Sequence, residues 1–200
     1  MRKITLTNGE YYHVFCRGVD GRVLFSNDID YLRVLWAINN LLESGYVTKP
    51  IIVKTDREFR SRIKILCYCF MPTHYHLLIQ QLRDKGITDF MHQLTTSYAK
   101  YYNVKNHRTG RLFESTFKTV HVVDEVQLLH LSRYIHLNPL MAHIATDISN
   151  YRWSSYKEYI SENRWGFCQT EDILSQFKTS DKYRVYSEYV MDYVTHKFDA

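Results

Sequence analysis

The chain has 200 residues, of which 45% are hydrophobic and 15% aromatic, and this composition supports a packed core and excludes a disordered polypeptide. The 26 Lys and Arg against 21 Asp and Glu give a net charge of +5, which permits a nucleic-acid partner but does not argue for one alone. No apolar run reaches transmembrane length and no secretory h-region is present, so we expect a cytoplasmic protein without membrane contacts. The four cysteines contain no CxxC pair and indicate free thiols in a reducing compartment.

The first predicted strand is Tyr11–Arg17, which ends at the glycines that follow it. Its alternation places His13, Phe15 and Arg17 on one face. That polar face lies either in solvent or near a ligand. A helix is expected next, from Asn27 or Asp28 to about Glu43.

The central feature is a predicted antiparallel hairpin, made of the apolar runs Ile63–Met71 and His74–Ile79 with Pro72-Thr73 as the turn. Because strand side chains alternate, His74 and His76 point to the same face. Two imidazoles at this spacing can ligate one metal ion. The alternative is that one histidine caps the turn and the other is an ordinary surface or core residue.

Helices and one further strand are expected in the second half. The stretch 100–111 is densely basic and contains two tyrosines, which suits a nucleic-acid strand but also fits a solvated helix end. Pro139 is expected to end its helix at or just after Asn138. The predicted elements are a helix at 87–102 capped by Thr88, a strand at 112–123, a helix at 125–137 and short helices at 152–160, 172–177 and 182–196.

Tyr134 and Asn138 lie four residues apart, and therefore about one turn apart on one face of the predicted helix. A phenol is a potential nucleophile, and an amide oxygen is a hard ligand for Mg²⁺ or Mn²⁺. The spacing fits equally a packed tyrosine followed by a helix-capping asparagine, so it does not decide between the two.

Five segments together resemble the single-tyrosine HUH transposases, and within them the REP-associated tyrosine transposases. The segments occur in the order of that family and cover roughly residues 10–160. Two departures are Thr73, where the family usually has Asn, and Thr116, where a basic residue is common. The matching segments are YHVFCRG (12–18), YCFMPTHYHLLI (68–79), GRLFESTFK (110–118), YIHLNP (134–139) and WSSY (153–156).

The resemblance implies an α+β fold, with an antiparallel sheet flanked by helices (ferredoxin-like or RRM-like), over residues 1–160, and we expect a helical C-terminal extension at 161–200. It implies that His74, His76 and Asn138 hold a divalent metal, Mg²⁺ or Mn²⁺, and that Tyr134 is the nucleophile. The implied activity is nicking and rejoining of single-stranded DNA next to a palindromic hairpin, through a 5′-phosphotyrosine, by a monomer or a homodimer. Candidate phosphate contacts are Arg17, Lys100, Arg108, Arg111 and Lys118.

Two rival functions are compatible with parts of the pattern. The first is a hairpin-binding protein of the same fold without catalysis; the intact His74, His76, Tyr134 and Asn138 argue against it. The second is a cupin-like dioxygenase, in which a His-x-His pair also lies on a strand. Such a site needs a nearby carboxylate and another His on a barrel strand, and the nearest downstream carboxylates, Asp84 and Asp89, fall in a predicted loop and at a helix start.

Overall fold

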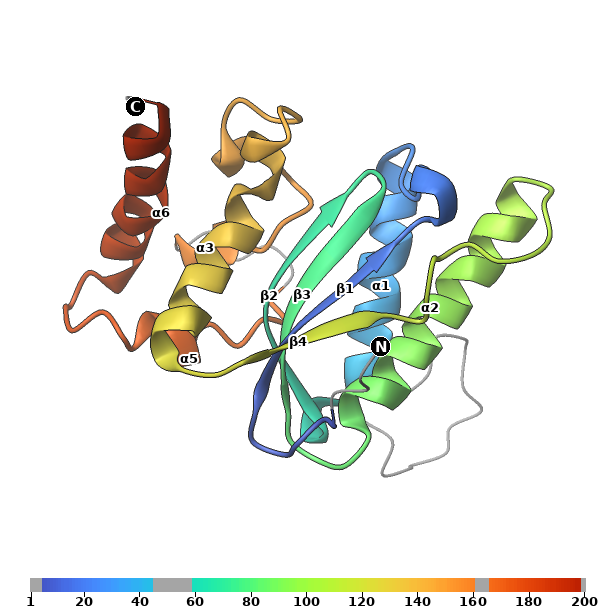
Figure 1. The fold of residues 1–200 in the computed structure, drawn as a ribbon, viewed down its shortest axis with the longest axis horizontal. Coiled ribbons are helices and arrows are strands. Elements are labelled where there is room, and N and C mark those ends of the chain that lie inside the picture. Colours follow the sequence, from blue (N-terminus) through green and yellow to red (C-terminus); the bar gives the residue numbers. More distant parts are fainter. Residues whose placement is uncertain (1–4, 45–58, 161–165, 199–200) are drawn as a thin grey trace.

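The computed structural model describes residues 5–44, 59–160 and 166–198 and shows a four-stranded antiparallel sheet between two layers of helices (Figure 1). The strand order is β2-β3-β1-β4. This confirms the predicted α+β architecture. The strands are β1 (Tyr11–Arg17), β2 (Ile63–Met71), β3 (His74–Gln81) and β4 (Lys118–Val122).

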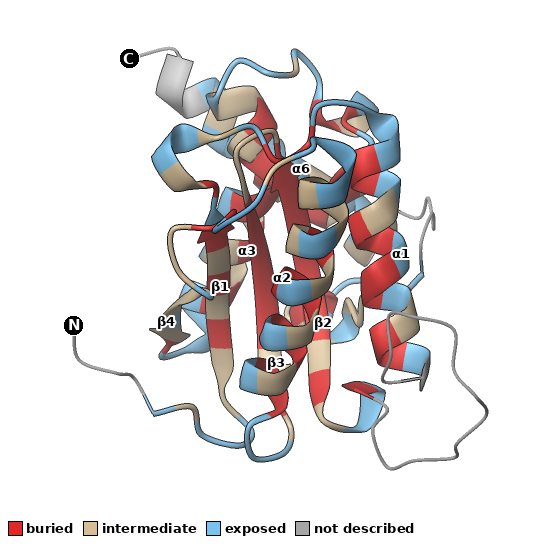
Figure 2. Ribbon diagram, turned by 90° about the vertical axis from the view of Figure 1, so that its right-hand side faces the viewer, coloured by how far each residue is buried: buried red, intermediate tan, exposed pale blue. Residues whose placement is uncertain are grey.

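Helices α1 and α2 cover one face of the sheet, and α3 covers the other, together with the C-terminal helices (Figures 1 and 2). None of the helices in the described ranges is long and apolar enough to cross a membrane. The helices are α1 (Asp28–Ser44), α2 (Gly86–Lys105), α3 (Glu125–Met141), α4 (Tyr156–Tyr159), α5 (Glu171–Leu174) and α6 (Lys182–Phe198), with short 3₁₀ turns η1 (Val19–Gly21), η2 (Phe59–Ser61) and η3 (Ile148–Asn150).

The central hairpin forms as predicted, with Pro72 and Thr73 as the two residues between β2 and β3. Directly opposed residues of neighbouring strands point to the same face of a sheet. On β1, Phe15 is opposite His76 and Arg17 is opposite His74. Phe15 is also opposite Lys118 of β4, so one face of three adjacent strands carries the histidines and two basic side chains.

The other face of β1 and β3 forms the core under α1 and α2. Cys16 is opposite Tyr75, whose ring lies 6.5 Å from Phe25 and 6.2 Å from Phe113. Tyr98 of α2 contacts both of these phenylalanines and is 1% exposed. The burial of this aromatic layer fixes which face of β3 is left to the histidines.

Two helix boundaries differ from the sequence prediction. Helix α2 begins at Gly86, two residues before the predicted cap Thr88, and follows Lys85 in the left-handed conformation (φ 59°). A Cβ at position 86 would lie 2.5 Å from the carbonyl oxygen of Arg62, so only glycine allows this close approach. Helix α3 runs through Pro139 to Met141 rather than ending at Asn138, because Pro139 is buried and tertiary packing overrides its local preference to end a helix.

Other predicted elements are shorter than expected. The strand predicted at 112–123 is regular only in β4, and its first part contributes a single bridge, from Phe113 to Gly18. The helices predicted at 152–160 and 172–177 shrink to α4 and α5. Helix α6 packs on α3 and buries Tyr186 and Val190 in the same core cluster as the sheet. The division of the chain at residue 160 stays a prediction.

Candidate active site

Three imidazoles and one phenol meet on the side of the sheet that faces α3. The ring centroids of His74 and His76, both on β3, are 5.0 Å apart, and that of His13 on β1 is 5.0 Å from His76. The ring of Tyr134, from the middle of α3, lies edge-on to them, 5.7 Å from His76 and 6.1 Å from His13. The fold therefore brings the predicted histidine pair and the predicted tyrosine together.

His76 is the most buried of these groups, at 6% exposure. Its Nδ1 lies 2.8 Å from Nε2 of His13, whereas its Nε2 is buried without a hydrogen-bond partner among the described residues. Burial, together with His13 and His74, lowers the pKa of His76 to about 3, and burial lowers the pKa of His13 to about 4. Both rings are therefore neutral near pH 7, which is the form that binds metals.

His74 is the first residue of β3, directly after the hairpin turn, and is less buried than His76. Its Nδ1 is 3.1 Å from Oγ1 of Thr73, so this turn residue contacts the ring. Burial lowers the pKa of His74, and the positive charge of Arg17 on the opposite strand lowers it further.

Tyr134 is accessible, with 52% of its surface exposed. Asn138 follows one turn later on α3, and its side-chain amide donates to the backbone oxygen of Tyr134 at 2.8 Å. Because that bond uses the nitrogen, the carboxamide oxygen is the atom that Asn138 can offer to a ligand. The two residues thus occupy one face of a continuous helix, as their spacing predicts.

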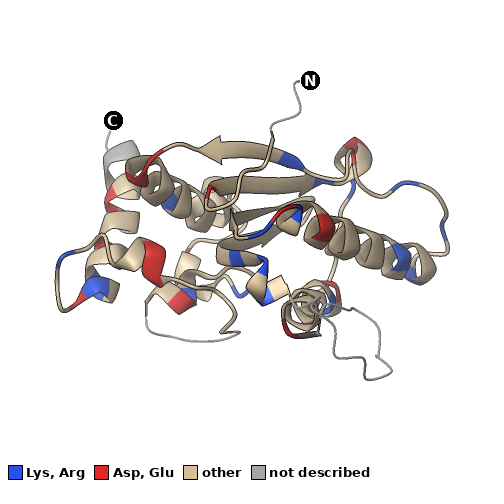
Figure 3. Ribbon diagram, turned by 90° about the horizontal axis from the view of Figure 1, so that it is seen from below, with Lys and Arg blue, Asp and Glu red and all other residues tan. Residues whose placement is uncertain are grey.

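The five predicted phosphate-binding residues are divided between two regions. Arg17 is exposed beside His74, and Lys118 lies on the same face of the sheet, where its Nζ is 3.2 Å from Oε2 of Glu114. Both lie on the side that carries Tyr134. Figure 3 shows the basic start of β4 together with the basic loop that follows α2.

The other three predicted basic residues lie on α2 and the loop after it. Arg108 donates to Oδ1 of Asn103 at 2.8 Å, and Arg111 donates to the backbone oxygen of Phe113 at 2.8 Å. Lys100 is exposed on α2, which covers the opposite face of the sheet. Of the five, only Arg17 and Lys118 lie on the face of the sheet that carries the histidines.

A second buried histidine, His136, anchors the helix that carries Tyr134. Its Nδ1 is 2.8 Å from the hydroxyl of Tyr186 on α6, and its Nε2 is 2.9 Å from Oγ of Ser155. Oγ of Ser155 also accepts from the backbone N–H of Tyr68 on β2 at 2.9 Å. Burial lowers the pKa of His136 to about 3. This network ties α3 to β2 and α6 and holds the phenol over the sheet.

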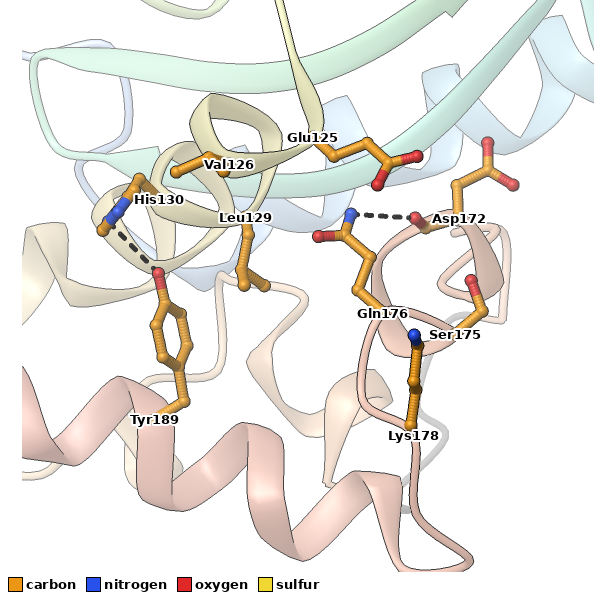
Figure 4. A pocket seen from close by; sticks show the side chains of 9 residues that line it. All are labelled: Glu125, Val126, Leu129, His130, Asp172, Ser175, Gln176, Lys178 and Tyr189. Carbon is orange, nitrogen blue, oxygen red and sulfur yellow. Dashed lines mark hydrogen bonds between the residues drawn. The ribbon is translucent and has the colours of Figure 1, made fainter.

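Two hollows flank Tyr134. One, of about 300 Å³, lies toward β4 and includes His13, His121 and Leu131. The other, of about 330 Å³, lies toward α6 and includes Leu137 and Tyr193. A third hollow of about 430 Å³ lies among α3, α5 and α6 (Figure 4) and contains neither Tyr134 nor the histidines of β3.

The described residues contain no group of three or more His, Cys, Asp or Glu side chains arranged to hold an ion. A ligand set of two imidazoles and one amide oxygen is compatible with that finding, because the third ligand is of another type. The buried and unpartnered Nε2 of His76 fits a metal ligand, since an orphaned polar atom in a protein interior is costly unless it binds something.

Comparison with known proteins gives matches in sequence and in fold. Residues 47–138 match the family model described as "Transposase IS200 like". The fold is similar to that in "Structure of the REP associates tyrosine transposase bound to a REP hairpin", with a TM-score of 0.59 and 12% identity over 90% of this chain and 95% of that one. No curated protein matches the sequence.

Proposed function

From the relationship of this chain to the IS200-like transposases, and from its REP-associated tyrosine transposase fold, we propose that it is a DNA-binding transposase that cuts and rejoins single-stranded DNA beside a hairpin. The observation that carries the proposal is the position of the exposed phenol of Tyr134, edge-on to His76 and His13. A nucleophile beside neutral imidazoles that can hold a cation suits attack on a phosphodiester.

We assign the ligands of a divalent cation, Mg²⁺ or Mn²⁺, to Nε2 of His76, the ring of His74 and the carboxamide oxygen of Asn138. When bound, the cation supplies positive charge that stabilises the charge developing on the phosphate. The amide oxygen of Asn138 suits either ion, because carbonyl oxygens are ligands for both Mg²⁺ and Mn²⁺.

In the proposed reaction, the side-chain oxygen of Tyr134 attacks the scissile phosphorus. A bond forms between that oxygen and phosphorus, and the bond from phosphorus to the 3′-oxygen breaks. The phenol loses its proton, and the departing 3′-oxygen gains one and becomes a free hydroxyl. A second 3′-hydroxyl can reverse the step at a new junction, so strands are exchanged without an outside energy source.

The surroundings of the phenol are suited to an unpaired strand. Tyr134 is accessible at 52% exposure, and hollows of about 300 and 330 Å³ lie on its two sides. Arg17, exposed beside His74, is positioned to contact a phosphate. The transposase of similar fold is bound to a REP hairpin, which supports a hairpin next to the cut.

The proposal is tested with a single-stranded oligonucleotide that carries a hairpin from the DNA flanking the gene, labelled at its 3′ end, with Mn²⁺ or Mg²⁺. A label that stays on the protein through a denaturing gel is expected for the native chain, and only a shortened free strand is expected with a 5′ label. EDTA and Tyr134→Phe should both abolish the adduct. Tyr183→Phe, at a tyrosine on α6 that is 38% exposed, is the matched control and should retain it.

Two results would count against the proposal. An adduct that survives Tyr134→Phe would place the nucleophile on another tyrosine. Tight hairpin binding without any adduct, across several cut-site sequences and both metals, would favour the rival function of a hairpin-binding protein without catalysis.

A further inference from the structure

His13 makes a close polar contact with His76 in the candidate active site. Its Nε2 lies 2.8 Å from Nδ1 of His76, and the two rings are nearly parallel, at 22°, with centroids 5.0 Å apart. The register fixes this contact, because Phe15 is directly opposite His76 and His13 is the next residue on the same face of β1. Neither the histidine pair nor the tyrosine motif includes this residue.

A hydrogen bond between two neutral imidazoles constrains both tautomers. Each ring carries one proton, and one nitrogen of the contact must donate while the other accepts. If His76 donates through Nδ1, its Nε2 carries a lone pair. If His13 donates instead, His76 must carry its proton on Nε2, which leaves an N–H buried without an acceptor among the described residues.

We propose that His13 is a positioning residue, which accepts the Nδ1 proton of His76 through its own Nε2 and so keeps Nε2 of His76 free to bind a divalent cation. The inference rests on the proposed function of the site. It is supported by the general role of a hydrogen bond to the second nitrogen of a ligating histidine, which fixes the tautomer and the ring orientation.

The geometry distinguishes this role from direct ligation. The Nε2 atom of His13 is already used by the contact with His76, so it is not free for a metal while that bond is kept. The choice of histidine also has an electrostatic consequence, because a carboxylate at this place would add a negative charge next to the cation. A neutral imidazole orients His76 and leaves the charge of the cation available to the phosphate.

His13→Phe and His13→Gln test the proposal together. Phenylalanine keeps the planar bulk but cannot accept a hydrogen bond, whereas the side-chain oxygen of glutamine can. His121→Phe, on β4, is the matched control, since His121 contacts Glu10 rather than His76. Thermal melts of all variants show whether the fold is retained.

The first measurement is Mn²⁺ affinity by calorimetry, without DNA. We expect His13→Phe to weaken binding about ten- to a hundredfold, and His13→Gln and His121→Phe to remain close to the native chain. Native affinity in His13→Phe would overturn the proposal. An equal loss in both His13 variants would also overturn it, because the imidazole itself would then be required.

The second measurement is the nitrogen NMR signature of His76 in the metal-free protein at neutral pH. The proposal predicts a proton fixed on Nδ1 in the native chain and in His13→Gln, and a mixture of tautomers in His13→Phe. A proton on Nε2 in the native chain would refute it. Because this readout needs neither metal nor DNA, it separates failure of the positioning role from failure of the proposed transposase function, which the adduct assay tests.

Discussion

The anchoring of α3 can be tested by removing one oxygen atom, with Tyr186→Phe. The hydroxyl of Tyr186 is buried and contacts Nδ1 of His136 at 2.8 Å and Oγ of Ser132 at 3.1 Å. Ser132 keeps a bond to the backbone oxygen of Leu129, so the variant leaves only one nitrogen of His136 without a partner. An unsatisfied buried polar atom costs about 1–3 kcal/mol.

For a chain of this size each kcal/mol corresponds to about 2–4 °C in Tm. We therefore expect Tyr186→Phe to lower Tm by about 2–12 °C, measured by circular dichroism and checked by the urea midpoint. Tyr183→Phe, at an exposed position of the same helix, should change stability by less than about 0.5 kcal/mol. Indistinguishable melting of the two variants would refute the idea that the network of His136 holds α3 in place.

Three further predictions use other features of the structure. Burial lowers the pKa of His136 to about 3, so the stability contributed by its neutral ring is full above about pH 6.5 and is lost as pH falls toward 3. His136→Leu should therefore make the urea midpoint less dependent on pH between these two values. An equal pH dependence of the midpoint in the variant and the native chain would contradict this. Arg17→Gln should weaken hairpin binding, measured by fluorescence anisotropy, and should reduce by about 1 the slope of the logarithm of the binding constant against the logarithm of the salt concentration. Lys100→Gln should have neither effect. Equal effects of the two variants would count against the placement of DNA on the α3 side. Burial raises the pKa of Cys16 to about 12 and that of Cys67 well above its usual value. A disulfide reagent should therefore react slowly with these thiols in the folded chain and rapidly in guanidinium. Fast labelling of Cys67 in the folded chain would contradict this prediction.

The central hairpin was predictable because its signals are local. Proline and threonine between two apolar runs define the turn, and strand alternation then places His74 and His76 on one face. The spacing of Tyr134 and Asn138 likewise determines that they share a helix face. What the alternation does not show is which strands are neighbours. The contact of His13 with His76 depends on the pairing of β1 with β3, between segments 63 residues apart.

The boundaries that sequence reasoning missed depend on tertiary contacts. Pro139 favours a helix end by its local chemistry, yet it is buried, and α3 continues past it to Met141. Residues before β4 alternate like a strand, but they bend beside the end of β1, where Glu114 donates to the backbone oxygen of Arg17. Gly86 starts α2 because of the nearby carbonyl of Arg62, which no local pattern shows.

The measurement that tests the central claim most directly is tandem mass spectrometry of the covalent adduct formed with the hairpin oligonucleotide. After nuclease trimming and trypsin digestion, the account predicts a nucleotide attached through its 5′-phosphate to Tyr134. The same peptide contains Tyr151, which is buried and donates to the backbone oxygen of Phe70 at 2.7 Å, so fragmentation must distinguish the two. A nucleotide on any other residue, or one attached through a 3′-phosphate, would contradict the account.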